Sequence, residues 1–103
     1  MGKSQNAKSV GAGQVDDLDR RFHAACRAIS KLCSGREANT EKGLIAIQVA
    51  LEQLPLTTYE FQIATNRLAN VRRYEKSNEA GAAIYEAKLL LGIIKRSRSA
   101  FPS

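Results

Sequence analysis

Apolar residues recur at every third or fourth position in four successive stretches of this chain. That spacing places the apolar side chains of each stretch on one face of a helix. Between the stretches lie residues that interrupt helices, namely Ser34-Gly35, Pro55 and Ser77-Asn78. The pattern predicts an all-α fold. The expected helices cover residues 16–33, 41–53, 58–76 and 79–96.

Three of the predicted helices begin with residues suited to that position. Residues 16–19 include three aspartates, which would place negative charge in the first turn of the first helix, where the helix dipole favours it. Asn39 or Thr40 can cap the second helix. Thr57 and Glu60 fit a capping box at the start of the third.

Each predicted helix has one apolar stripe, and the four stripes together predict one hydrophobic core. Ile45 and Val49 are expected to widen the stripe of the second helix. The stripe residues, in chain order, are Leu18, Phe22, Ala25, Ile29, Leu32, Leu44, Ile47, Leu51, Leu54, Phe61, Ala64, Leu68, Val71, Ala80, Ala83, Ile84, Ala87, Leu90, Leu91 and Ile94.

The 103 residues have the length of one domain. Residues 1–14 contain little to bury and carry Lys3 and Lys8, which predicts a disordered basic tail. Residues 15–97 make up the predicted helical domain, and residues 98–103 are expected to fray. The helices can pack as a four-helix bundle or as two stacked helical hairpins. The sequence shows no signal peptide and no membrane-spanning run, so we expect a cytoplasmic protein that does not enter a membrane.

The fourth predicted helix is apolar on more than one face. Beyond its stripe, a second face is formed by Ala82, Tyr85, Leu89 and Ile93. A helix that is apolar almost all round has to be buried almost all round, and a small domain offers few neighbours to bury it. We therefore predict that this second face binds a partner protein, most simply a second copy of the chain.

Residues suited to catalysis or metal binding are sparse. His23 and Cys26 share a helix face, but Cys33 lies about 10 Å beyond Cys26 along the same helix. That separation is too long for a disulfide or for a shared tetrahedral metal site. A Cys–His catalytic pair would also need an orienting group and an oxyanion site. We predict no catalytic residue, no metal site and no cofactor, and hence a non-enzymatic, self-associating protein-interaction or regulatory module.

The net charge of +6 leaves an alternative open. A basic helix surface can bind the phosphates of DNA or RNA. Arg20, Arg27 and Lys31 of the first helix share roughly one face, and they would add to this surface if the basic faces coincide. The residues predicted to carry this alternative are Arg67, Arg72, Arg73, Lys76, Lys95 and Arg96.

A helix-turn-helix is a second form of the nucleic-acid alternative. The break at Pro55 would then separate a first helix from a recognition helix. Gln and Asn side chains on such a helix can pair with adenine. The base-reading residues would be Thr58, Tyr59, Gln62 and Asn66.

Overall fold

The computed structural model describes residues 2–35 and 39–100, and the side chains of residues 17–35 and 39–100. The described residues form four helices and no strand, so the all-α prediction is confirmed. The helices are α1 (Gly2–Cys33), α2 (Thr40–Glu52), α3 (Thr58–Lys76) and α4 (Ala80–Ser99).

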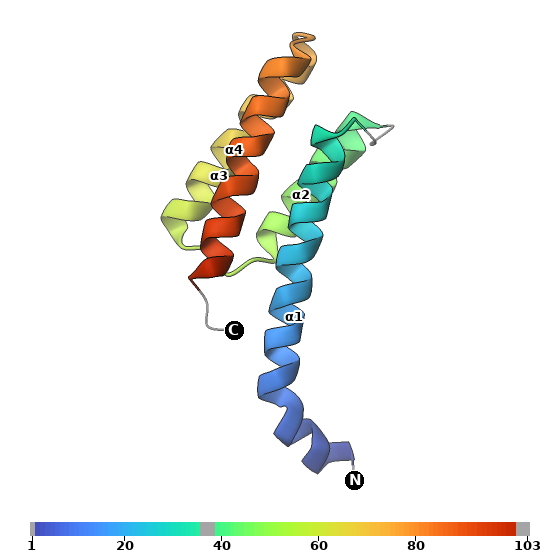
Figure 1. Cartoon of the computed structure of the whole chain (residues 1–103), viewed down its shortest axis with the longest axis vertical. Coiled ribbons are helices and arrows are strands. Elements are labelled where there is room, and N and C mark those ends of the chain that lie inside the picture. Colours follow the sequence, from blue (N-terminus) through green and yellow to red (C-terminus); the bar gives the residue numbers. More distant parts are fainter. Residues whose placement is uncertain (1, 36–38, 101–103) are drawn as a thin grey trace.

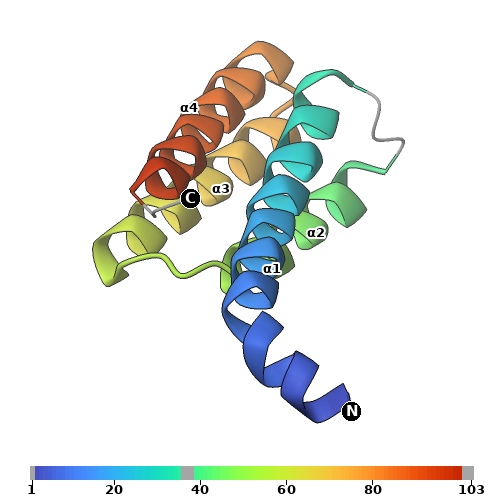
Figure 2. The same ribbon diagram turned by 60° about the horizontal axis from the view of Figure 1, so that its bottom comes forward.

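Successive helices run in opposite directions, which makes α1–α2 and α3–α4 two antiparallel hairpins (Figure 1). α1 also contacts α4 and α2 contacts α3, so each helix has two neighbours and the four close into a bundle. The α2–α3 contact is the least extensive of these. α1 and α4 lie side by side in front of the other two helices in Figure 2. The fold is therefore a four-helix bundle made from two hairpins that join mainly along α1 and α4.

The predicted stripes form one hydrophobic core. Its members are the buried side chains of Phe22, Ala25, Ile29, Leu44, Ile47, Leu51, Leu54, Ala64, Leu68, Val71, Ala83, Ala87, Leu90 and Ile94. Leu32, Phe61 and Leu91 pack against this core and are half-buried. Two expectations are wrong: Ala80 is exposed at the start of α4, and Ile45 and Val49 are about half exposed. Both α2 residues lie outside the core because α3 covers little of α2.

The predicted caps are confirmed at two helix starts. Asn39 caps α2, its side chain accepting a hydrogen bond from the Lys42 N–H at 3.0 Å. Thr57 Oγ1 accepts from the Glu60 N–H at 3.0 Å, and Glu60 Oε1 accepts from the Thr57 N–H at 2.9 Å. This reciprocal capping box fixes where α3 begins, because it pairs two amides that the helix itself leaves unbonded.

A short left-handed turn sends the chain from α3 back along α4. Asn78 has a φ of 63°, a conformation that asparagine tolerates better than most residues. The N–H of Glu79 donates to the carbonyl of Tyr74 at 2.8 Å, and the N–H of Asn78 donates to that of Glu75 at 3.2 Å. These two bonds form a Schellman motif, which ends α3 and lets α4 start almost at once.

The helix bounds differ from the prediction at both ends of the bundle. α1 begins at Gly2, so the three aspartates of residues 16–19 lie inside the helix and not in its first turn. The first half of α1 projects past the other helices (Figure 1), and a helix without such neighbours is marginal in water. That residues 1–14 are disordered in solution therefore stays a prediction. α4 continues to Ser99, and residues 101–103, where fraying is expected, lie outside the described residues.

Candidate interaction surfaces

The second apolar face of α4 remains accessible to solvent in the single chain. Tyr85 is 63% exposed and Leu89 is 36% exposed, whereas Ala82 and Ile93 are half-buried. The opposite side of the same helix packs into the core through residues such as Leu90. The helix thus has one apolar side that the bundle uses and another that it leaves largely open.

A buried carboxylate borders this face. Glu86 is only 8% exposed and accepts hydrogen bonds from Arg67 Nη1 at 2.8 Å and from Asn70 Nδ2 at 3.1 Å. The hydrogen bond from the Arg67 guanidinium is the main reason that the pKa of Glu86 lies below its ordinary value, and burial opposes this shift. Arg67 is therefore engaged in tying α3 to α4. Sequence reasoning missed this pair because only the pairing of the two helices brings the residues together.

The structure does not bring the other predicted basic residues into one surface. Arg72 Nη1 is 3.0 Å from Glu41 Oε2 on α2, and Arg73 donates to the side chain of Asn70. Lys76 is exposed at the carboxyl end of α3. The remaining two, Lys95 and Arg96, are exposed near the carboxyl end of α4. Because α3 and α4 are antiparallel, these two groups lie towards opposite ends of the bundle, about 20 Å apart along the helix axis.

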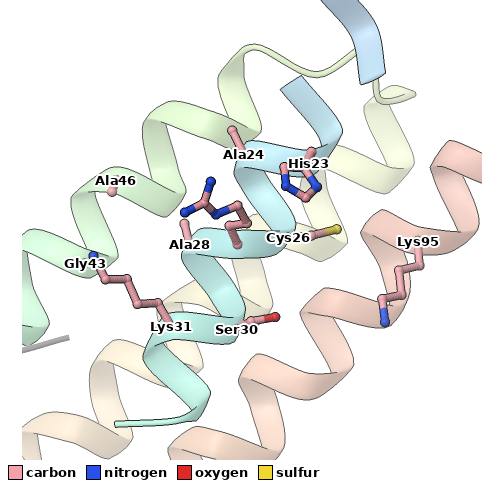
Figure 3. Close-up of a pocket in the computed structure, with 10 residues that line it drawn as sticks. His23, Ala24, Cys26, Ala28, Ser30, Lys31, Gly43, Ala46 and Lys95 are labelled. Carbon is pink, nitrogen blue, oxygen red and sulfur yellow. The ribbon is translucent and has the colours of Figure 1, made fainter. Parts of the chain in front are cut away.

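Two adjoining hollows lie along the outer surface of α1. The first has a volume of about 710 Å³ and extends on both sides of α1, to Gly43 and Ala46 of α2 and to Lys95 of α4 (Figure 3). The second, of about 640 Å³, lies between α1 and α4 and is lined by Asp19, Arg20, Phe22, His23, Cys26, Lys95, Arg98 and Ser99. His23, Cys26 and Lys95 line both hollows, which therefore form one continuous depression.

The two cysteines are half-buried free thiols on α1. Burial raises the pKa of Cys26 above its ordinary value, although the nearby charges of Lys95 and Arg98 act in the opposite direction. Burial likewise raises the pKa of Cys33, against the charge of Lys88. The raised pKa values lower the fraction of thiolate, the nucleophilic form, at both residues. Among the described residues no group of three His, Cys, Asp or Glu side chains is placed to hold a metal ion.

The residues of the helix-turn-helix alternative all lie at the surface. Thr58, Tyr59, Gln62 and Asn66 are exposed on the first half of α3, and Tyr59 is 72% exposed. The five residues between α2 and α3 include Pro55, as that alternative requires. Base reading by these side chains stays a prediction.

Comparisons with protein-family models, with characterised proteins and with solved structures find no match for this chain. Within the described part of the chain, no helix is both long enough and apolar enough to cross a membrane. The surfaces described above therefore have to be interpreted from their own chemistry.

Proposed function

We propose that the protein is a non-enzymatic interaction or regulatory module that self-associates through the second apolar face of α4. The observation that carries this proposal is the exposure of Tyr85 and Leu89, one turn apart on a helix whose other side is buried. Tyrosine is enriched at protein interfaces because it combines a large apolar ring with a polar hydroxyl group. The two free thiols suit a reducing compartment, so we place the protein in the cytoplasm.

A two-fold contact is the simplest way to cover this face. In an antiparallel pairing of two α4 helices, Tyr85 of each copy would lie against Leu89 and Ile93 of its partner. The same patch then serves both copies, so no second complementary surface is needed. The Arg67–Glu86 pair at the border would remain inside each copy and hold the orientation of α4 against α3.

The test is the solution mass of the protein by light scattering over a wide range of concentration. The variant Tyr85→Ser/Leu89→Ser removes the two exposed apolar side chains without changing charge. The matched control is Ile45→Ser/Val49→Ser on α2, because these residues are also about half exposed and one turn apart. We expect dimeric wild-type and control proteins and a monomeric α4 variant.

Two results would contradict the proposal. A wild-type mass that stays monomeric at every concentration would show that α4 does not mediate self-association. A dimer that survives in the α4 variant and is lost in the α2 control would place the contact on α2 instead. Circular dichroism of both variants establishes that each remains folded.

A further inference from the structure

Basic side chains border the line of contact between α1 and α4. Arg20, Lys95 and Arg98 line one hollow there, and Arg27 and Lys31 line the adjoining one. Lys88 is close enough to Cys33 on α1 for its charge to lower the pKa of that thiol, which places it beside the same line. We call this surface the seam face. Its six basic residues, all exposed, are Arg20, Arg27, Lys31, Lys88, Lys95 and Arg98.

Little negative charge offsets the seam face. Among the described residues lining the two hollows, Asp19 is the single acidic side chain, and it forms an ion pair with Arg98. Arg20, Arg27, Lys88 and Lys95 form no ion pair with any residue whose side chain is described. These four side chains leave the seam face with a net positive charge.

The six charges are arranged in two rows on neighbouring helices. Arg20 and Arg27 are seven residues apart on α1, and Lys88 and Lys95 are seven apart on α4, so each pair spans about 10 Å. The continuous depression lies between the two rows, and the charged groups border it on both sides. An elongated ligand with regularly repeated negative charges would match two such rows better than a single small anion would.

We infer that the seam face binds the phosphate backbone of a nucleic acid. A membrane surface or an acidic protein would also supply negative charge, but both normally require apolar contact in addition. The large apolar side chains that are exposed in the described part of the chain are Ile45, Val49, Tyr59, Tyr85 and Leu89, and none lines either hollow. Among the described residues that line the hollows there is no exposed phenylalanine or tyrosine ring for base stacking, and the one exposed ring is the imidazole of His23. The binding is therefore directed at phosphates and is independent of sequence.

The test measures the affinity of the full chain for a fluorescein-labelled mixed-sequence DNA duplex by anisotropy, over salt from about 50 to about 200 mM. The variant Arg27→Gln/Lys88→Gln/Lys95→Gln removes three charges from the seam face. The control Arg73→Gln/Lys76→Gln/Arg96→Gln removes three charges from outside it. The two variants have the same net charge, and thermal unfolding shows whether both are folded.

We expect the wild-type affinity to fall steeply with salt, with a log–log slope of about −3 to −4 if about four phosphates are contacted. The seam variant should bind at least about tenfold more weakly at low salt with a slope reduced by about 2 to 3, and the control should change much less. Equal losses in the two variants would show that only overall charge matters. Failure of the wild type to bind the duplex would overturn the inference, as would binding only to vesicles rich in phosphatidylserine.

Discussion

Leu89 and Leu90 are adjacent leucines that the fold uses in opposite ways, so replacing each by alanine tests the orientation of α4. Leu90 is fully buried in the core, whereas Leu89 is 36% exposed on the second apolar face. Truncating a buried leucine removes its transfer free energy and leaves a cavity, for a cost of about 3 to 4 kcal/mol. Leu89→Ala should cost less than about 1 kcal/mol, because its side chain leaves water only in part.

The loss at Leu90 is large for a domain of this size. Domains of this length have a total stability of about 5 to 15 kcal/mol, so Leu90→Ala should remove about a fifth of it or more. At about 4 to 8 °C per kcal/mol, its melting temperature should fall by about 12 to 30 °C. The assay is urea and thermal unfolding followed by circular dichroism, at a protein concentration low enough to keep the chain monomeric.

The reasoning predicts a second difference between the two variants. At high protein concentration the wild type should gain stability by dimerising, and Leu89→Ala should not. The difference in stability between the two proteins should therefore be larger at high concentration. Leu90→Ala should show the same loss at both concentrations. Equal destabilisation of the two variants in the monomer would refute the assignment of the two faces.

Three further outcomes follow from contacts in the bundle. Thr57→Ala removes the side-chain half of the α3 capping box and should cost about 1 kcal/mol in urea unfolding, whereas Thr58→Ala should cost less. The pKa of Glu86 is lower in the folded state than its ordinary value of 4.5, so the ionised carboxylate stabilises the folded state at pH values above 4.5. This contribution is lost as the pH falls through the folded-state pKa. The free energy of unfolding should therefore depend less on pH in the acid range in Glu86→Gln than in the wild type. An unchanged pH profile would contradict this role of Glu86. Because burial raises the pKa of Cys26 and Cys33, both should react more slowly with iodoacetamide at pH of about 8 in the folded protein than in urea. Mass spectrometry measures the extent of alkylation over time. Equal rates in both conditions would argue against the burial of the two thiols.

The local features of the fold could be predicted from sequence because neighbouring residues determine them. The period of the apolar residues places Phe22, Ile47 and Leu90 in the core, and the Thr57–Glu60 spacing fixes the start of α3. The start of α1 was predicted too late, because the aspartates of residues 16–19 suit the first turn of a helix, whereas α1 begins at Gly2. The exposure of Ile45 depends on how little α3 covers α2, which no local pattern contains.

The basic surfaces were harder to predict for the same reason. Charge density along the chain is highest near the end of α3, so Arg67 and Arg72 stood out. The antiparallel packing instead pairs Arg67 with Glu86 and Arg72 with Glu41. It also places Arg27 of α1 and Lys95 of α4 along one hollow, although they are far apart in sequence. Which charges cluster is a property of helix pairing.

α4 borders α1 on one flank and α3 on the other, and its two candidate surfaces lie on these opposite flanks. The seam face follows the α1 flank, and Tyr85 and Leu89 lie on the flank that carries Glu86 and contacts α3. A dimer joined through Tyr85 and Leu89 would therefore leave both seam faces uncovered and directed outward. Such a dimer would have two binding sites for nucleic acid. It could hold two nucleic-acid segments at once, or bind one segment at two places with a gain in avidity. Loss of the dimer would then weaken attachment to a long polymer far more than to a short one.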